Sequence, residues 1–134
     1  MELTIMLTNA EKIKYVKPER YRQVFCVDKP IFDLMLETLD EQSVKEGKII
    51  RKISTLDKLI MFLEYWYEGR ITEVIGANYG LTKSNVSIIA NWVEGALRQN
   101  PTIVLPAKRK WDEQLIAKSM MTEDGHFYIK TSKI

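Results

Sequence analysis

The sequence is poor in the residue types that build disulfides, metal centres and thiol or imidazole active sites. Its 134 residues include one cysteine, Cys26, and one histidine, His126. A single cysteine excludes an intrachain disulfide framework and is typical of a reducing compartment. One cysteine and one histidine do not make a tetrahedral zinc site by themselves. We therefore expect no metal and no cofactor, and we interpret Cys26 as a small buried apolar residue and His126 as a tail residue.

Long apolar segments are also missing. A helix that crosses a bilayer needs about 18 consecutive apolar residues, whereas the densest apolar run, residues 59–67, is interrupted by Glu64. The opening segment MELTIML is too short and too acidic for a signal peptide. We therefore expect a cytoplasmic protein that has no membrane partner.

The sequence does contain enough apolar residues for one folded domain, with 46% hydrophobic and 28% charged residues. The net charge of +2 is small, but the charges are placed unevenly. Residues 70–110 carry a net charge of +4 and residues 11–22 a net charge of +3, while acidic residues concentrate between Asp33 and Glu46. Each basic cluster is either a solvated face or a surface for a polyanion.

Apolar residues recur at helical spacing along nearly the whole chain, and the breaks between them carry start and stop signals. Asp28-Lys29-Pro30 and Ser54-Thr55-Leu56-Asp57 are typical of capped helix starts, and Gly47 and Gly69 of helix ends. We expect an all-α domain of five to six helices, at about 18–25, 28–47, 55–67, 71–79, 83–99 and 111–121. The stretch HFYIKTS (126–132) is expected to be a short strand or a tail.

One stretch, IGANYGLTKSNVSIIANWVE at 75–94, places Gly80 between two helical patterns. Two helices that cross over a turn of about three to four residues need small residues at the crossing and a residue that accepts positive φ at the turn. Gly76 and Ala77 meet the first need, and Gly80 meets the second. An apolar stripe marks the inner face of the second helix: Val86, Ile89, Ala90, Val93 and Leu97. The pattern predicts a helix-turn-helix at about residues 71–98.

The opposite face of the second helix is polar and has no acid before Glu94. In helix-turn-helix proteins this part of the second helix reaches base edges in the major groove. The expected base contacts are Lys83, Ser84, Asn85, Ser87, Ile88 and Asn91. The expected phosphate contacts are Thr82, which also caps the helix, together with Arg98, Lys108, Arg109 and Lys110. The alternatives are a plain helical hairpin with solvated charges and, for Arg98, a side chain that complements the helix dipole.

Four segments together resemble the N-terminal helix-turn-helix domain of DDE-class insertion-sequence transposases: VDKPIFDLML (27–36), ISTLDKLIMFLEYWYEG (53–69), EVIGANYGLTKSNVSIIANWVE (73–94) and LPAKRKW (105–111). The resemblance implies recognition of a transposon end. In that family a ribonuclease-H-like domain follows, in which three carboxylates bind two divalent metals. The only carboxylates after Trp111 are Asp112, Glu113, Glu123 and Asp124, so no catalytic residue is assigned.

The resemblance divides the chain into an N-terminal arm (1–17), a DNA-binding domain (18–111) and a C-terminal helix and tail (112–134). It implies sequence-specific binding of double-stranded DNA by a truncated or split transposase, with a separately encoded catalytic portion as partner and no enzymatic activity of its own. Two alternatives stay open, a stand-alone transcriptional regulator and a helical protein–protein interaction module. In the second, the interface would be formed by Trp92 and the aromatic residues Phe62, Tyr65, Trp66 and Tyr67. In a homodimer, Trp92 would be the contact. Helical spacing favours a core position for these aromatics.

Overall fold

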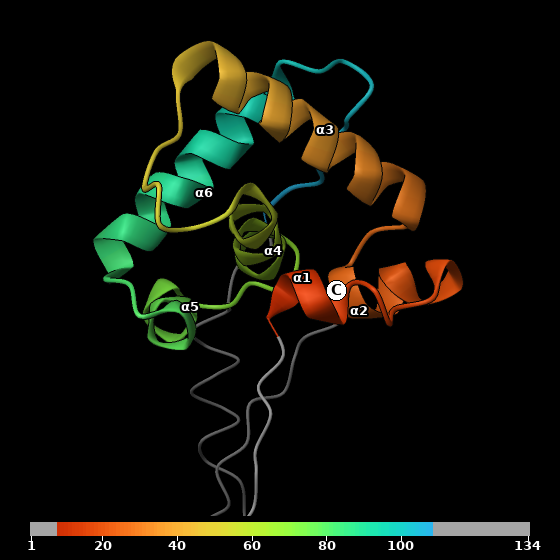
Figure 1. Ribbon diagram of the computed structural model, residues 1–134, viewed down its shortest axis with the longest axis horizontal. Helices are drawn as coiled ribbons and strands as arrows, with labels where there is room; N and C mark the ends of the chain where they lie inside the picture. Colours follow the sequence, from red (N-terminus) through yellow and green to blue (C-terminus); the bar gives the residue numbers. More distant parts are fainter. Residues whose placement is uncertain (1–7, 109–134) are drawn as a thin grey trace, which may run out of the picture.

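The computed structural model describes residues 8–108, and this part of the chain is helical without strands. Its elements are α1 (Asn9–Lys12), a 3₁₀ turn η1 (Pro18–Arg20), α2 (Tyr21–Phe25), α3 (Lys29–Glu46), α4 (Thr55–Trp66), α5 (Thr72–Tyr79) and α6 (Lys83–Arg98) (Figure 1). The predicted all-α fold is therefore confirmed for the described residues. The helix predicted at 111–121 and the strand or tail at 126–132 lie outside them, as do Arg109 and Lys110.

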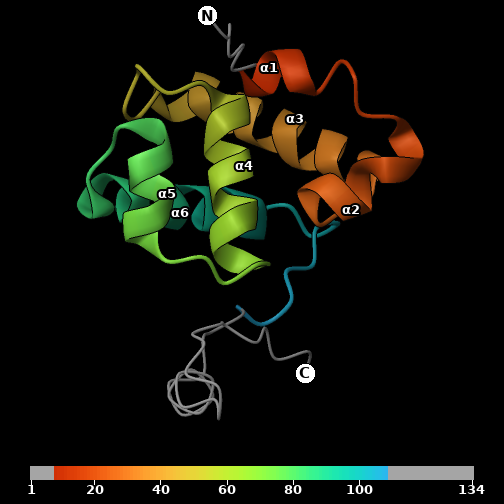
Figure 2. The same ribbon diagram turned by 90° about the horizontal axis from the view of Figure 1, so that it is seen from below.

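Helix α4 forms the centre of the domain, and each of the other five described helices contacts it (Figures 1 and 2). Residues 59–63 of α4 are buried without interruption, because this helix is apolar nearly all round rather than along one stripe. Helices α3 and α6 contact α4 and each other, and α5 packs against both α4 and α6. This packing around α4 fixes where α5 and α6 meet.

The aromatic residues of α4 belong to the core, as their spacing predicts. Phe62 is fully buried, and its ring stacks against that of Trp66 with centroids 5.4 Å apart. Tyr65 and Tyr67 are partly buried and pack against the same core. A second aromatic cluster, formed by Tyr21, Phe25 and Phe32, joins α2 to α3 with ring centroids 4.9–5.3 Å apart.

The predicted caps are confirmed at Ser54 and Gly47 but not at Asp28 or Gly69. Helix α4 ends at Trp66 with Tyr67 as its C-cap, so Gly69 lies two residues beyond the cap. The Ser54 hydroxyl accepts from the Asp57 backbone N–H at 3.0 Å, and Gly47 ends α3 with φ of 83°. Asp28 occupies the N-cap position of α3, but its side chain makes no capping hydrogen bond, so that prediction is wrong. Its carboxylate instead pairs with the Arg22 guanidinium, at 2.6 and 3.0 Å. Two hydrogen bonds between charged groups are stronger than one to a neutral backbone N–H.

The segment assigned to an N-terminal arm contains α1, which packs on α4. The Asn9 amide group donates to Asp57 Oδ1 and lies at hydrogen-bond distance from the Tyr79 hydroxyl, both at 2.7 Å. Asn9 thereby joins the start of α4 to the end of α5. Within residues 8–108, no helix has the length and apolar character needed to cross a membrane.

Candidate nucleic-acid interface

The turn between α5 and α6 consists of residues 80–82, as predicted. Gly80 adopts the left-handed conformation, with φ of 66° and ψ of 35°, which other residues reach only with strain. The Leu81 backbone N–H donates to the Gly76 carbonyl at 2.8 Å, which closes the end of α5 in the manner of a Schellman motif. The Thr82 hydroxyl accepts from the Asn85 backbone N–H at 3.2 Å, so the predicted N-cap of α6 is confirmed.

The crossing of the two helices depends on Gly76. A Cβ atom at this position would lie 2.4 Å from the Leu81 carbonyl oxygen and 3.5 Å from Val86 Cγ2. No side chain therefore fits between α5 and the turn. Ala77 was predicted to share this role, but it is exposed, because one residue along a helix is a rotation of about 100°.

The inner face of α6 is closed to solvent. All five residues of the predicted apolar stripe are buried, with Ala96 in addition: Val86, Ile89, Ala90, Val93, Ala96 and Leu97. Helix α6 packs this stripe against α3, α4 and α5. The orientation of its polar face is thus determined by the core.

That polar face points to solvent. Of the six residues predicted to contact bases, Asn85 is partly buried and five are exposed: Lys83, Ser84, Ser87, Ile88 and Asn91. Ile88 exposes 51% of its surface, which is high for a β-branched apolar residue. The structure brings these side chains together on the first two and a half turns of α6, without an acidic residue among them.

Arg98, predicted to contact phosphate, already has two partners. Its Nε atom donates to Glu94 Oε2 at 2.8 Å, and its guanidinium lies 5.6 Å from the centroid of the Trp66 ring. The side chain is still 54% exposed, so it can reach a further anion while Glu94 offsets part of its charge.

The exit segment, residues 99–108, is held against α4. The Trp66 indole N–H donates to the Pro106 carbonyl at 2.8 Å, and Ile103 is buried. Lys108 Nζ lies 4.2 Å from the centroid of the Tyr65 ring, a cation–π contact. These contacts fix the point from which the predicted basic run 108–110 begins.

Sequence reasoning missed Lys58, a lysine of α4 that is completely buried. Its Nζ donates to the Ile49 carbonyl in the α3–α4 connection and lies 5.6 Å from the centroid of the Trp92 ring on α6. Burial lowers the pKa of the Lys58 ammonium, with repulsion from Lys48 as a second cause. The available signal was a lone lysine within an apolar helix, one residue before the run at 59–63.

The Cys26 thiol lies against a carboxylate and not against a group that would activate it. Cys26 is half-buried rather than buried as predicted, because it ends α2 at φ of 73° and its thiol donates to Glu68 Oε1 at 3.5 Å. Burial, followed by the negative charge of Glu68, raises the pKa of the thiol to about 12. A thiol with such a pKa is not a nucleophile near neutral pH.

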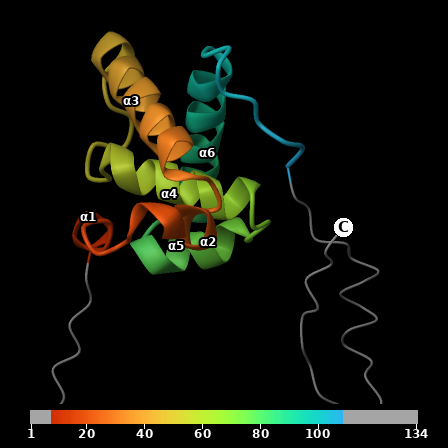
Figure 3. The ribbon, with the colours of Figure 1, turned by 90° about the vertical axis from the view of Figure 1, so that its right-hand side faces the viewer.

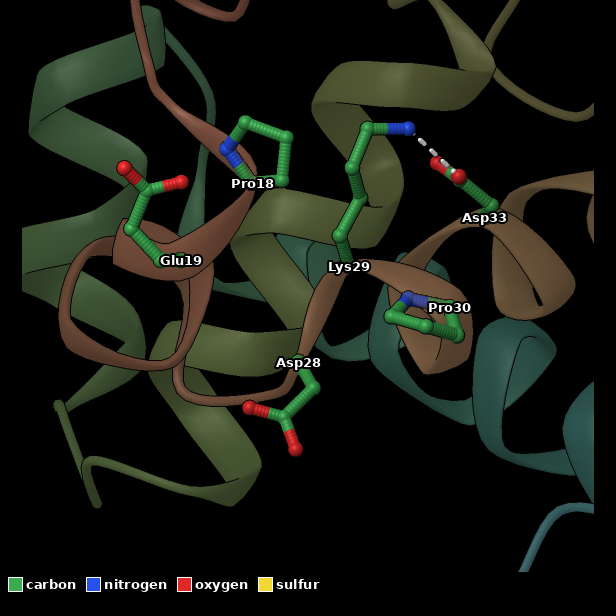
Figure 4. A pocket seen from close by; sticks show the side chains of 6 residues that line it. All are labelled: Pro18, Glu19, Asp28, Lys29, Pro30 and Asp33. Atoms are coloured by element: carbon green, nitrogen blue, oxygen red, sulfur yellow. Dashed lines mark hydrogen bonds and ion pairs between the residues drawn. The ribbon is translucent and has the colours of Figure 1, made fainter.

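A surface hollow of about 600 Å³ lies between η1 and the start of α3 (Figure 4). Three carboxylates line it, from Glu19, Asp28 and Asp33, with Lys29 as the single cation. The Lys29 ammonium is paired with Asp33 at 2.6 Å. The negative balance makes this hollow unsuited to phosphate, in contrast to the outward face of α6.

Within residues 8–108, no group of histidine, cysteine, aspartate and glutamate side chains is arranged to hold a metal ion.

Comparison with known proteins finds a partial similarity at low identity. It is similar to a protein from Microchaete diplosiphon described as a probable transposase for insertion sequence element IS702, with 26% identity over 102 residues. The similar region covers 75% of this chain, and the chain spans 37% of the length of that relative. No family model matches the chain, and no solved structure matches it. At low identity, the chain is thus related to a transposase over three-quarters of its length.

Proposed function

We propose that the chain binds double-stranded DNA and inserts the outward face of α6 into the major groove. One observation carries the proposal: the buried stripe of α6 and the tight turn at Gly76 and Gly80 present an acid-free polar face to solvent. A helix face that is merely solvated usually carries glutamate and lysine, whereas this face carries Lys83 as its one charge before Glu94. A face without carboxylates does not repel the phosphates of DNA.

The residues on this face suit base recognition. An asparagine such as Asn91 can bind adenine in a bidentate manner, and an exposed isoleucine such as Ile88 can contact the thymine methyl group. Ser84 and Ser87 are adaptable donors and acceptors. The free N–H groups in the first turn of α6, beside Lys83, favour a phosphate.

The relative suggests the biological target. Because that protein is described as a transposase, we infer that this chain recognises a transposon end, and that binding rather than strand cleavage is its activity. The catalytic step would then belong to a separate portion of the transposase. A stand-alone transcriptional regulator would use the same α6 face on a promoter sequence instead.

Binding to duplex DNA as a function of salt tests the proposal. Each phosphate contact contributes about −0.9 to the slope of log affinity against log salt concentration. Replacement of Lys108, Arg109 and Lys110 with alanine should flatten the slope by about two to three units, equally on specific and random duplexes. Circular dichroism should show unchanged helicity. A wild-type chain without affinity for duplex DNA at low salt would instead favour the protein-interaction module.

A further inference from the structure

The connection between α3 and α4, residues 47–54, carries an exposed basic cluster that has no part in the proposed α6 interface. We call these residues the connector. Lys48, Arg51 and Lys52 are all exposed, and none of them forms an ion pair within the described residues. Lys45, in the last turn of α3, adds a fourth basic side chain, against a single acid at Glu46. Unpaired cations of this density attract an anionic partner.

The connector is not a loose loop, because its apolar and backbone groups are anchored. Ile53 is buried, its backbone N–H donates to the Ile50 carbonyl at 3.0 Å, and Lys58 holds the Ile49 carbonyl. Ile50 adopts a φ of 44°, an uncommon conformation for a β-branched residue that surrounding contacts must maintain. The three basic side chains therefore project from a fixed backbone.

The anchor places the connector beside α6. The same Lys58 ammonium that binds the Ile49 carbonyl lies over the Trp92 ring, and Trp92 directly follows Asn91 on α6. In Figure 1 the connector runs down from the end of α3 to the start of α4. The cluster thus borders one edge of the proposed base-reading face.

The exit segment borders the other edge. Trp92 and Arg98 are six residues apart, which places them about 120° apart around an α-helix of about 3.6 residues per turn. Trp92 faces Lys58 and the connector, whereas Arg98 faces Trp66, which binds the exit segment. Figure 3 shows the connector and the exit segment on opposite sides of the domain.

We propose that the connector is a phosphate-binding site that holds the DNA backbone on the Trp92 side of α6. The proposal rests on the proposed function and adds a partner for a surface not otherwise assigned. A major groove is about 12 Å wide and is bordered by a row of phosphates on each side. A helix seated in it is held in register by cations at both edges. Lys48, Arg51 and Lys52 supply the cations at one edge, and Lys108, at the end of the exit segment, supplies one at the other.

The test compares two triple alanine variants of the full chain that remove the same charge. In the connector variant, Lys48, Arg51 and Lys52 are replaced. In the control variant, Lys14, Lys17 and Arg20 are replaced; these residues are also exposed, and lie on the segment between α1 and α2, to the lower right in Figure 1. Fluorescence anisotropy with a labelled duplex at several salt concentrations gives the affinity and its salt slope.

We expect the connector variant to flatten the salt slope by about two to three units and to leave the preference among base sequences unchanged. The control variant should change the slope by less than one unit. Because all six side chains are exposed, both variants should retain the wild-type melting temperature. Single variants such as Lys52→Ala should each flatten the slope by about one unit, which keeps the test valid if the triple variant folds poorly.

The outcomes separate this inference from the proposed function. A wild-type chain that does not bind duplex DNA overturns both. If the wild type binds and the connector variant keeps its full slope, the connector site is wrong while duplex binding by α6 stands. If the control variant loses as much slope as the connector variant, binding follows net charge rather than position, and the connector site is again wrong.

Discussion

Substitution of Gly76 by alanine tests the packing that orients α6. Alanine is favoured over glycine in a helix interior by about 1 kcal/mol, so helix propensity alone predicts stabilisation. The structure predicts the reverse, since the new Cβ would lie 2.4 Å from the Leu81 carbonyl oxygen. That oxygen belongs to the turn backbone and cannot move like the end of a flexible side chain. Overpacking of this kind costs about 1–3 kcal/mol, so after the propensity gain we expect a net loss of up to about 2 kcal/mol.

Gly95 provides a matched control on α6. A Cβ atom at Gly95 would meet no atom within 4 Å, so Gly95→Ala should retain the propensity gain and stabilise by about 0.5–1 kcal/mol. Thermal unfolding followed by circular dichroism separates the two variants, because 1 kcal/mol shifts the melting temperature of a domain of this size by about 4–8 °C. If Gly76→Ala melts at or above the temperature of Gly95→Ala, the close approach of α5 to the turn is wrong.

Two further predictions concern DNA. Asn91→Ala should weaken binding to the preferred site by about 1–3 kcal/mol and relax one base position, measured by selection from random duplexes; an unchanged selected sequence would remove Asn91 from the base contacts. With magnesium or manganese the purified chain should neither nick nor join DNA, measured on a labelled duplex; cleavage that survives repurification and is lost in Asp124→Asn would contradict the proposed role in binding alone.

The sequence predicts α5, the turn and α6 to within about a residue, because their signals are local. Gly80 takes the left-handed conformation at its own position, and Thr82 caps α6 through the N–H of Asn85, three residues on. The apolar stripe of α6 repeats along one face. The same locality explains why the exposed face of α6 is predicted correctly. Exposure follows from periodicity, whereas contact with DNA stays a prediction.

The contacts that the sequence does not reveal are those between segments distant along the chain. Asp28 is a nearer case: it has the pattern of a cap, yet Arg22, six positions earlier, takes its carboxylate. The hydrogen bond from Trp66 to Pro106 spans 40 positions, and no local pattern encodes it. Ala77 was misplaced for a different reason, because the exact crossing of α5 and α6 depends on one glycine rather than on a small pair.

Lys58 is the clearest case of a residue whose role depends on the fold. A buried ammonium is unfavourable unless it finds a partner, and a methionine at this position would pack without that penalty. The structure gives Lys58 two partners that methionine lacks, the Ile49 carbonyl and the face of the Trp92 ring. We infer that Lys58 fixes the connector against α6 at the expense of stability near neutral pH.

This inference has a pH dependence of definite sign. Burial lowers the pKa of Lys58 in the folded chain below its usual 10.5, so the unfolded chain binds more protons between the two values and stability rises with pH across that window. The pKa values of the Cys26 thiol and the Tyr79 hydroxyl are raised to about 12 in the folded chain, so these two groups reduce stability as the pH rises above 9. The wild type and Lys58→Met share both groups, so the difference in stability between the two chains isolates the contribution of Lys58. In urea unfolding measured from pH 7 to 10, the free energy of unfolding of Lys58→Met should lack the increase with pH that Lys58 contributes. The salt slope of this variant for duplex binding should also flatten, because the connector is released. A variant whose stability tracks the wild type at every pH, with an unchanged salt slope, would refute both the buried charge and the anchor.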